Sequence, residues 1–266
     1  MTANFVAREA GWRIDDWGEG DRSTQAAFRD PATYEARFGD LLDEAVALGF
    51  RAVDVWDGHL NAEWVTDEQI ATARRLLDAR GLRVASLAGW FGSTPERFER
   101  TCEIAAALGA PILGGGTSLL TTARAALVAG LERHDLRLAI ENHPKERTPD
   151  DMLAEIGDGG NGRIGTTVDT GWWGTQGVDA ADAIRALAPH VMHVHLKDVR
   201  AVGEPHETCR FGEGVVPIRR CVEALGEIGY DGAISVEHEP YDRDPRREIE
   251  QNLGDLRSWL AGEASS

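Results

Sequence analysis

The sequence predicts an α/β protein built as one closed (β/α)8 barrel, and three observations lead to this prediction. Its 266 residues match the ~250 residues that such a barrel needs. Short β-rich runs alternate along the whole chain with amphipathic helical patterns. At four places a helical pattern ends at a glycine directly before such a run, at Gly49, Gly81, Gly109 and Gly229. An open, doubly wound sheet of eight parallel strands is the alternative.

The β-rich runs are short and largely apolar, as parallel strands buried on both faces should be. They predict eight strands, at residues 11–15, 51–56, 82–87, 110–115, 136–141, 163–169, 190–196 and 232–237. Apolar residues at helical spacing predict helices around 38–48, 70–77, 98–105, 118–133, 149–157, 180–188, 218–225 and 246–261. The pairs Thr94-Pro95 and Thr148-Pro149 are typical of a helix N-cap followed by the first helical residue.

No proline- or serine-rich linker divides these units, so residues 1–266 are expected to form a single domain. Two connections are longer than a simple joint, at 15–31 after the first predicted strand and at 197–215 after the seventh. Both follow the carboxyl end of a strand, where barrels carry their chemistry. We therefore expect them to be irregular active-site loops.

Charge and composition exclude several classes of function. The 28 basic and 45 acidic residues give a net charge of −17 without a concentrated basic patch, which argues against binding to nucleic acid or to an anionic membrane surface. The first residues contain no apolar run of signal-peptide length, and no run approaches the ~18 residues of a membrane span. Three cysteines, an odd number, fit reduced thiols in the cytoplasm.

Ionisable residues lie at the ends of the last four predicted strands. Glu141, Asp169 and Glu237 each end a strand, and His195 lies one residue before the end of another. In a barrel these positions converge on one funnel. Three neighbouring carboxylates would repel one another unless a cation neutralises them. This ligand set suits Mn²⁺ or Mg²⁺, with Zn²⁺ or Co²⁺ as alternatives, so we expect one divalent ion and Mn²⁺ first.

Five motifs resemble the xylose isomerase-like barrel superfamily, often described as sugar phosphate isomerase/epimerase-like. They are AIENH at 139–143, GTTVDTG at 165–171, HVHLKD at 193–198, GEG at 212–214 and GYDGAISVEHE at 229–239. The resemblance covers the whole chain and is densest from 139 to 240. It implies one divalent metal held by Glu141, Asp169, His195 and Glu237, with the two glutamates doubling as acid and base on opposite faces of a sugar. It also favours His195 over His193 as the ligand.

A metal on an α-hydroxy-ketone acidifies the neighbouring C–H, so that a carboxylate or histidine can remove the proton and leave an enediolate. His143, two residues after Glu141, is a candidate base or acid, or a histidine that orients a carboxylate. Lys197 is a candidate for stabilising an oxyanion, or it pairs with Asp198. Candidate substrate-binding residues are His59, Trp17, Trp56, Trp90, Trp172 or Trp173, His193, His206 and Arg210.

The choice of reaction depends on one departure from the family pattern. Many members carry a histidine three residues after the ligand Asp169, whereas this chain has Trp172. HLKDVR at 195–200 instead resembles inosose dehydratases and related lyases of 3-keto-glycosides, some of which cleave C-glycosides with a small β-sandwich partner. We therefore favour β-elimination on a keto-sugar or oxidised glycoside slightly over ketose epimerisation or isomerisation.

Two other functions stay open at this stage. An apurinic endonuclease shares the barrel, but such nucleases use three zinc ions, more histidines than the eight here, and a basic surface. A non-catalytic sugar-binding barrel would not need four converging metal ligands. The expected partner is a small sugar or glycoside, without nucleic acid or membrane. A homo-oligomer or a small β-sandwich accessory subunit is open.

Overall fold

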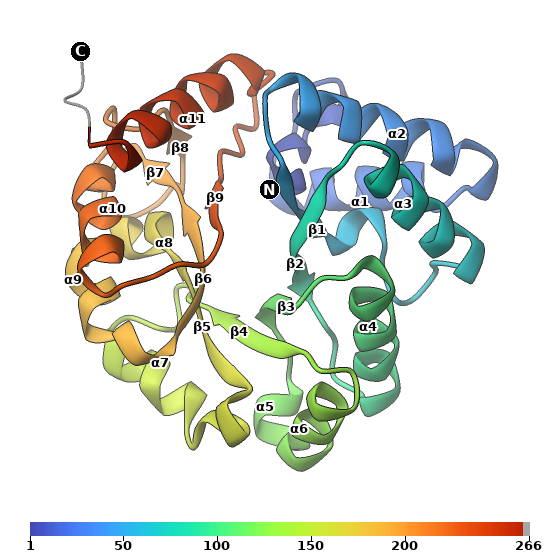
Figure 1. Cartoon of the computed structure of the whole chain (residues 1–266). Helices are drawn as coiled ribbons and strands as arrows, with labels where there is room; N and C mark the ends of the chain where they lie inside the picture. The colour runs from blue at the N-terminus through green and yellow to red at the C-terminus, as the bar shows by residue number, and fades with distance from the viewer. Residues whose placement is uncertain (263–266) are drawn as a thin grey trace.

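The computed structural model describes residues 1–262 and has the expected barrel architecture (Figure 1). Seven parallel strands form one sheet in the order β1-β2-β3-β4-β5-β6-β9, with helices around the outside. The strands are β1 (Ala52–Trp56), β2 (Arg83–Trp90), β3 (Ile112–Gly116), β4 (Arg137–Glu141), β5 (Ile164–Asp169), β6 (Val191–Leu196) and β9 (Ile234–Val236). The prediction of a (β/α)8-type barrel is therefore confirmed, with β1 and β9 at the two edges of the sheet.

Every predicted helix is present, 118–133 as the two helices α5 (Leu119–Thr122) and α6 (Arg124–Arg133), and α1 (Trp17–Phe28) and α8 (Thr170–Thr175) are helices that the sequence did not predict. The other helices are α2 (Pro31–Ala47), α3 (Asp67–Ala79), α4 (Pro95–Leu108), α7 (Pro149–Ile156), α9 (Ala180–Ala186), α10 (Ile218–Glu227) and α11 (Arg246–Leu260). Thr94 and Thr148 are N-caps, each followed by proline. The four glycines predicted after helices all have positive φ, between 64° and 91°. Within residues 1–262, no helix has the length and apolarity needed to cross a bilayer.

The first predicted strand, at 11–15, is wrong. Gly11 and Trp12 both have positive φ, which an extended strand does not allow, and the preceding residues form two short 3-10 helices, Thr2–Phe5 and Arg8–Ala10. This N-terminal segment lies between β9 and β1 (Figure 1). Thr2 Oγ1 accepts the Trp56 N–H at 2.8 Å, and Asn4 Nδ2 donates to the Val236 carbonyl at 3.1 Å. Side chains here make the bonds that an eighth strand's backbone would have made.

The expected irregular loop at 15–31 is also wrong, because most of it is helix α1. Asp16 caps this helix by accepting the Glu19 N–H, and Asp30 caps α2 directly after it. Gly20 lies where α1 crosses the N-terminal segment, and a Cβ there would come within 2.6 Å of Val6. Gly20 is therefore needed for close packing and not for irregular backbone.

The second long connection, 197–215, is ordered around one carboxylate. It contains the antiparallel pair β7 (Asp198–Val199) and β8 (Thr208–Cys209). Asp198 accepts backbone N–H bonds from Val199, Gly212, Gly214 and Val216, at 2.9–3.1 Å. A Cβ on Gly214 would lie 2.1 Å from the Val199 carbonyl oxygen. The GEG motif thus wraps the loop around Asp198 and leaves Lys197 to face the barrel.

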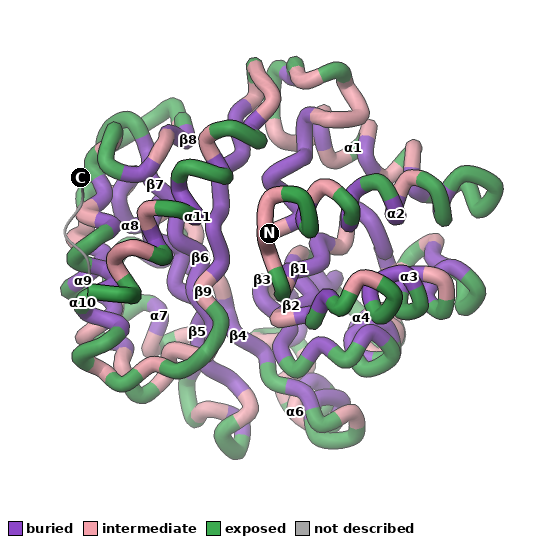
Figure 2. Tube along the Cα trace, turned by 45° about the horizontal axis from the view of Figure 1, so that its top comes forward, coloured by how far each residue is buried: buried purple, intermediate pink, exposed green. Residues whose placement is uncertain are grey.

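The core lies in the barrel and between the strands and the helices, whose outer faces are exposed (Figure 2). The strands carry apolar residues outward against the helices, whereas the barrel interior also contains buried polar side chains. Asp54, Ser86, Thr167 and His195 are each 0% exposed. Buried polar groups cost free energy unless they are paired, so the polar side chains of the barrel interior are candidates for a functional role.

Candidate metal centre and active site

Four neighbouring strands bring the four predicted ligands to one rim of the barrel. Glu141 ends β4 and Asp169 ends β5, while His195 lies at the end of β6 and Glu237 directly follows β9. One potential ligand atom of each residue, a carboxylate oxygen or an imidazole nitrogen, lies within 4.8 Å of the corresponding atoms of the other three. We call these four residues the carboxylate–histidine cluster. His195, Asp169 and Glu237 are buried, and the side chain of Glu141 is 13% exposed.

His195 is at the centre of this cluster. Its Nδ1 lies 3.0 Å from Glu141 Oε1 and 2.9 Å from Glu237 Oε2. Two carboxylates therefore approach the same ring nitrogen from different strands. Burial alone would lower the pKa of His195, but the charges of Glu237 and Glu141 raise it well above its ordinary value.

Lys197 places a positive charge beside the carboxylates of the cluster. Its Nζ lies 2.6 Å from Glu237 Oε1, 3.2 Å from Asp169 Oδ2 and 3.3 Å from Glu239 Oε2. Burial would lower the pKa of this lysine, but the three carboxylates hold it well above its usual range. The alternative that Lys197 pairs with Asp198 is wrong, since Asp198 is occupied by backbone N–H groups.

Hydrogen bonds to α8 and to Asn142 fix the orientation of Asp169. Its Oδ1 accepts the Gly171 and Trp172 N–H groups at 2.7 and 3.0 Å and thereby caps α8. Its backbone is bonded on both sides by Asn142, at 2.8 and 2.9 Å. Oδ1 is thus committed to the helix, and only Oδ2 remains for the cluster.

The cluster has the donor set that a divalent cation requires. Asp169 Oδ2 and Glu237 Oε2 are buried and accept no hydrogen bond, and their charged neighbours are Lys197 Nζ and His195 Nδ1. Burial raises the pKa of Asp169 to about 6, with Glu237 and Glu141 acting in the same direction against Lys197. Burial would also raise the pKa of Glu237, but Lys197 and His195 hold it below its usual range. Three carboxylates and one imidazole fit Mn²⁺, Mg²⁺ or Zn²⁺.

Three aromatic rings lie beside the cluster, and we call them the aromatic wall: His143, Trp172 and His206. Trp172 stacks on His206 with ring centroids 3.7 Å apart, and its centroid lies 5.7 Å from that of His143. Lys197 Nζ lies 5.9 Å from the Trp172 ring. His206 comes from the long connection between β7 and β8, so this segment does contribute a side chain near the site.

Hydrogen bonds indicate the tautomers of both histidines of the wall. The Glu141 carbonyl can only accept, so His143 donates through Nδ1, at 3.1 Å. Thr175 gives its hydroxyl proton to the Gly171 carbonyl and therefore accepts from His206 Nδ1, at 2.6 Å. Burial, aided by Lys197, lowers the pKa of His206 to about 3. In their neutral forms, both histidines carry an unprotonated Nε2.

The remaining predicted substrate residues have other neighbours. His59 is 2% exposed, contacts Thr2 Oγ1 at 3.2 Å and packs edge-on against Phe28, and burial lowers its pKa to about 3. Arg210 forms an ion pair with Asp255 of α11 at 2.8 Å.

The predicted tryptophans divide between core, rim and surface. Trp56 and Trp173 are buried, at 3% and 0%, and Trp90 at the end of β2 is 52% exposed. Trp17 Nε1 lies 3.5 Å from Glu239 Oε1, so it reaches the carboxylate that Lys197 also contacts.

Two residues near the cluster were not singled out from the sequence. Glu239 joins Lys197, and burial raises the pKa of this glutamate to about 7. Its position two residues after Glu237 was a usable signal, because alternate strand residues share a face. Asp54 lies in the middle of the apolar strand β1 and contacts His193 at 3.0 Å. A carboxylate inside a buried strand was the signal there.

Comparison with known proteins agrees with the barrel. A sequence model of the xylose isomerase-like TIM barrel family matches residues 42–261. The uncharacterized protein MJ1311 of Methanocaldococcus jannaschii is 31% identical over 114 residues, which cover 40% of this chain and only 38% of that protein.

Three solved structures are similar in fold. A xylose isomerase-like TIM barrel protein from Mycobacterium smegmatis in complex with magnesium is 19% identical, with a TM-score of 0.71 over 88% of this chain and 91% of that one. A D-allulose 3-epimerase from Methylomonas sp. is 18% identical, with a TM-score of 0.67 over 89% and 96%. The probable 3-DHS dehydratase AsbF from Bacillus anthracis is 16% identical, with a TM-score of 0.62 over 83% and 93%.

At these identities the structures establish a common fold, and two of these proteins are named as a 3-epimerase and a probable dehydratase. The family model begins at residue 42, after the N-terminal segment and α1, and extends through β9 into α11. It spans well over half of the 266 residues. The chain therefore belongs to the xylose isomerase-like TIM barrel family.

Proposed function

We propose that this protein is a divalent-metal-dependent enzyme that removes a proton next to the carbonyl of a keto-sugar or oxidised glycoside. The observation that carries the proposal is the convergence of Glu141, Asp169, His195 and Glu237 within 4.8 Å, where two buried carboxylate oxygens have only ion-pair contacts. A divalent ion held by these residues would polarise the substrate carbonyl and acidify the adjacent C–H. Mn²⁺ is the ion we expect first.

His143 is the proposed base in this reaction. Its Nδ1–H is held by the Glu141 carbonyl, which leaves an unprotonated Nε2 on a half-buried ring beside the cluster. A neutral imidazole with a free Nε2 can act as a general base. Glu141 and Glu237 are the alternative bases, and Lys197 is placed to stabilise negative charge on the substrate oxygen.

The aromatic wall favours elimination over epimerisation. β-Elimination needs a base and also an acid that protonates the leaving group, and a titratable side chain outside the four metal ligands can take one of these roles. His143 is such a side chain. The flat face of Trp172, which stacks on His206, is suited to an apolar sugar face or a bulky aglycone. His206 Nε2, which is buried and lacks a partner, is the proposed acceptor for a substrate hydroxyl.

Epimerisation is the second candidate, and a specific contact favours it. Glu141 and Glu237 approach His195 Nδ1 from two different strands, at 3.0 and 2.9 Å. Two carboxylates that converge on one point can act as base and acid on opposite faces of a planar intermediate. Oligomerisation and a β-sandwich accessory subunit remain separate proposals that no contact in the chain addresses.

Product analysis in D₂O separates the two reactions. The protein, loaded with Mn²⁺, is incubated with a panel of ketoses and 3-keto-glycosides, and the products are identified by NMR. An unsaturated or shortened product supports elimination, and an epimer that carries solvent deuterium supports epimerisation. A Glu237→Gln variant treated in the same way is the matched control. Substrates unchanged and free of deuterium across the whole panel would contradict both.

A further inference from the structure

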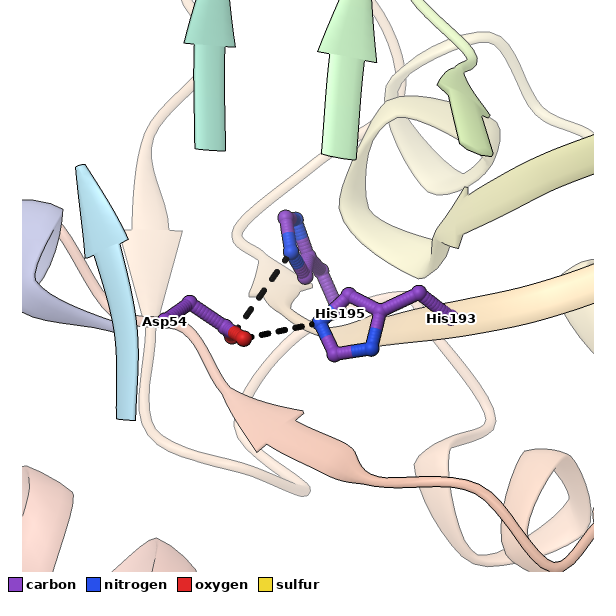
Figure 3. A group of neighbouring side chains, drawn as sticks. All are labelled: Asp54, His193 and His195. Atoms are coloured by element: carbon purple, nitrogen blue, oxygen red, sulfur yellow. Dashed lines mark ion pairs between the residues drawn. The ribbon is translucent and has the colours of Figure 1, made fainter. Parts of the chain in front are cut away.

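The second ring nitrogen of His195 lies on the opposite side from the carboxylate–histidine cluster. Nδ1 faces Glu141 and Glu237, whereas Nε2 points into the barrel, where the residue is 0% exposed. Nε2 has no hydrogen-bond partner. The charged group that faces it is Asp54 of β1, with Oδ2 at 3.9 Å (Figure 3).

The carboxylate of Asp54 has one acceptor position left. On Oδ1 it faces the Ser86 hydroxyl at 2.8 Å and His193 Nε2 at 3.0 Å, and on Oδ2 it accepts the Ser235 hydroxyl. An ionised carboxylate offers about four acceptor positions. Three are used, and the fourth, on Oδ2, is on the atom that faces His195. One unused acceptor and one unpartnered ring nitrogen therefore lie opposite each other in a fully buried site.

His193 holds this arrangement from the side. Its ring meets that of His195 edge-on, with centroids 5.1 Å apart and an interplanar angle of 87°. With its Nε2 bonded to Asp54, His193 fixes the carboxylate rather than reaching the barrel mouth. Ser86 and Ser235 come from β2 and β9, so four strands fix the position of one carboxylate.

A cation in the cluster would need one particular tautomer of His195. Nδ1 lies among the carboxylates and must offer a lone pair, so the single proton of the neutral ring must sit on Nε2. A buried N–H without an acceptor opposes this tautomer. A movement of about 1 Å would bring Asp54 Oδ2 from 3.9 Å into hydrogen-bond range.

We propose that Asp54 is a positioning residue that accepts the Nε2–H of His195 and so presents Nδ1 to the metal. The inference rests on the metal site of the proposed function and adds to it a residue of the barrel interior that does not contact the metal. Carboxylates that orient a ligating histidine typically change metal affinity by 10–100-fold. His193 is then a support for Asp54, not a substrate contact.

The test compares Asp54→Ala and Asp54→Asn with Ser86→Ala, which removes a partner of Oδ1 but leaves the acceptor toward His195. Mn²⁺ dissociation constants and stoichiometry are measured by calorimetry, and circular dichroism checks the fold. We expect both Asp54 variants to bind one equivalent of Mn²⁺, with Asp54→Ala weakened about 10–100-fold. The Mn²⁺ dissociation constant of Ser86→Ala should stay within about threefold of the wild-type value. This variant keeps Asp54, the acceptor for the Nε2–H of His195, and a 10–100-fold effect is expected only when that acceptor is lost.

A second measurement remains decisive if the Asp54 variants do not fold. In the wild type loaded with Zn²⁺, ¹⁵N–¹H correlation spectra should show the Nε2–H proton of His195 shifted downfield, as a hydrogen bond to a carboxylate requires, and exchanging slowly. An Nε2–H proton at the shift of an imidazole N–H without an acceptor, or unchanged affinity in Asp54→Ala, would overturn the inference and leave the proposed function intact. Two equivalents of metal in the wild type and one in Asp54→Ala would also overturn it, because Asp54 would then be a ligand. If the wild type binds no divalent ion, both the role of Asp54 and the proposed metal-dependent function are contradicted.

Discussion

Lys197 Nζ lies 2.6 Å from Glu237 Oε1, and this pair balances the charge of the carboxylate–histidine cluster. The lysine is 3% exposed and also reaches Asp169 and Glu239. Thr170 fixes the backbone of Lys197 on both sides, at 2.8 and 2.9 Å. Its ammonium group is therefore a fixed part of the site, and three carboxylates depend on it.

Replacing Lys197 with Met should destabilise the metal-free protein strongly. The substitution leaves buried carboxylates without their cation, and breaking a buried ion pair from one side costs about 3–5 kcal/mol. Urea unfolding measures this loss. Arg219→Met is the control, because Arg219 and its partner Glu223 are 52% and 54% exposed and their pair should contribute at most about 1 kcal/mol. Equal losses in both variants would show that Lys197 does not neutralise the cluster.

Metal content should follow the cluster residues and not their neighbour. We expect about one equivalent of divalent ion in the wild type and a large loss in Glu237→Gln, because the amide is a poor replacement for a carboxylate ligand. Glu239→Gln is the matched control, since Glu239 contacts Lys197 but lies outside the cluster. Elemental analysis after gel filtration gives the content. Full occupancy in an Asp169→Ala, His195→Ala double variant would rule out this site.

Metal affinity should rise with pH. The pKa of Asp169 is raised to about 6 by burial, and that of His195 is raised by Glu237 and Glu141 against the effect of burial, so both groups hold protons that a metal must displace. Each displaced proton contributes about tenfold in affinity per pH unit. Calorimetry between pH 5.5 and 7.5, in buffers of different ionisation heat, counts the protons. An affinity independent of pH would contradict the raised values.

The stability of the metal-free protein should have the opposite pH dependence. The folded-state pKa of Asp169, at about 6, lies above its ordinary value of 3.8, so the folded protein binds more protons than the unfolded chain between these values. The contribution of Asp169 to stability is therefore lost as pH rises through that window. Thermal unfolding of wild type and Asp169→Asn at pH 4.5 and 6.5 tests this, because the difference between the two proteins should change with pH only through Asp169.

His143 should affect turnover without affecting metal binding. Its ring is bonded through Nδ1 to a backbone carbonyl and lies outside the cluster, so His143→Ala and His143→Gln should retain the metal. Loss of a general acid or base typically lowers turnover about 10²–10⁴-fold. His134→Gln is a control at a histidine that pairs with Glu99 on α4. Unchanged turnover in both His143 variants would favour the two-glutamate epimerase.

The fold was predictable wherever local chemistry and global packing agree. The glycines that end helices and the Thr-Pro pairs that begin them recur from one β/α unit to the next. The pattern of short apolar runs identified seven of the strands. Two predictions failed because tertiary contacts decided the outcome. Residues 11–15 read as a strand, but Asn4 and Thr2 bridge the barrel edges with side chains. The length of the 15–31 connection suggested a loop, but it forms α1, in which Gly20 lets the helix pack on Val6.

The cluster was predictable because parallel strands must bring their carboxyl ends to one rim. Spacing alone could not show which way a side chain beyond the strand turns. Lys197 and Asp198 are adjacent in sequence, yet one faces three carboxylates and the other organises a loop. The partners of Asp54 come from β2, β6 and β9, and only the curvature of the barrel brings them together.

Metal-dependent exchange of a carbon-bound proton tests the central claim most directly. The wild type is stripped of metal, divided, and incubated in D₂O with the keto-sugar panel, with and without one equivalent of Mn²⁺. ¹H NMR should show loss of the signal next to the carbonyl only in the Mn²⁺ sample, and Glu237→Gln should show no loss in either. Equal exchange with and without Mn²⁺, or no exchange and no product in any sample, would contradict metal-dependent proton abstraction at this cluster.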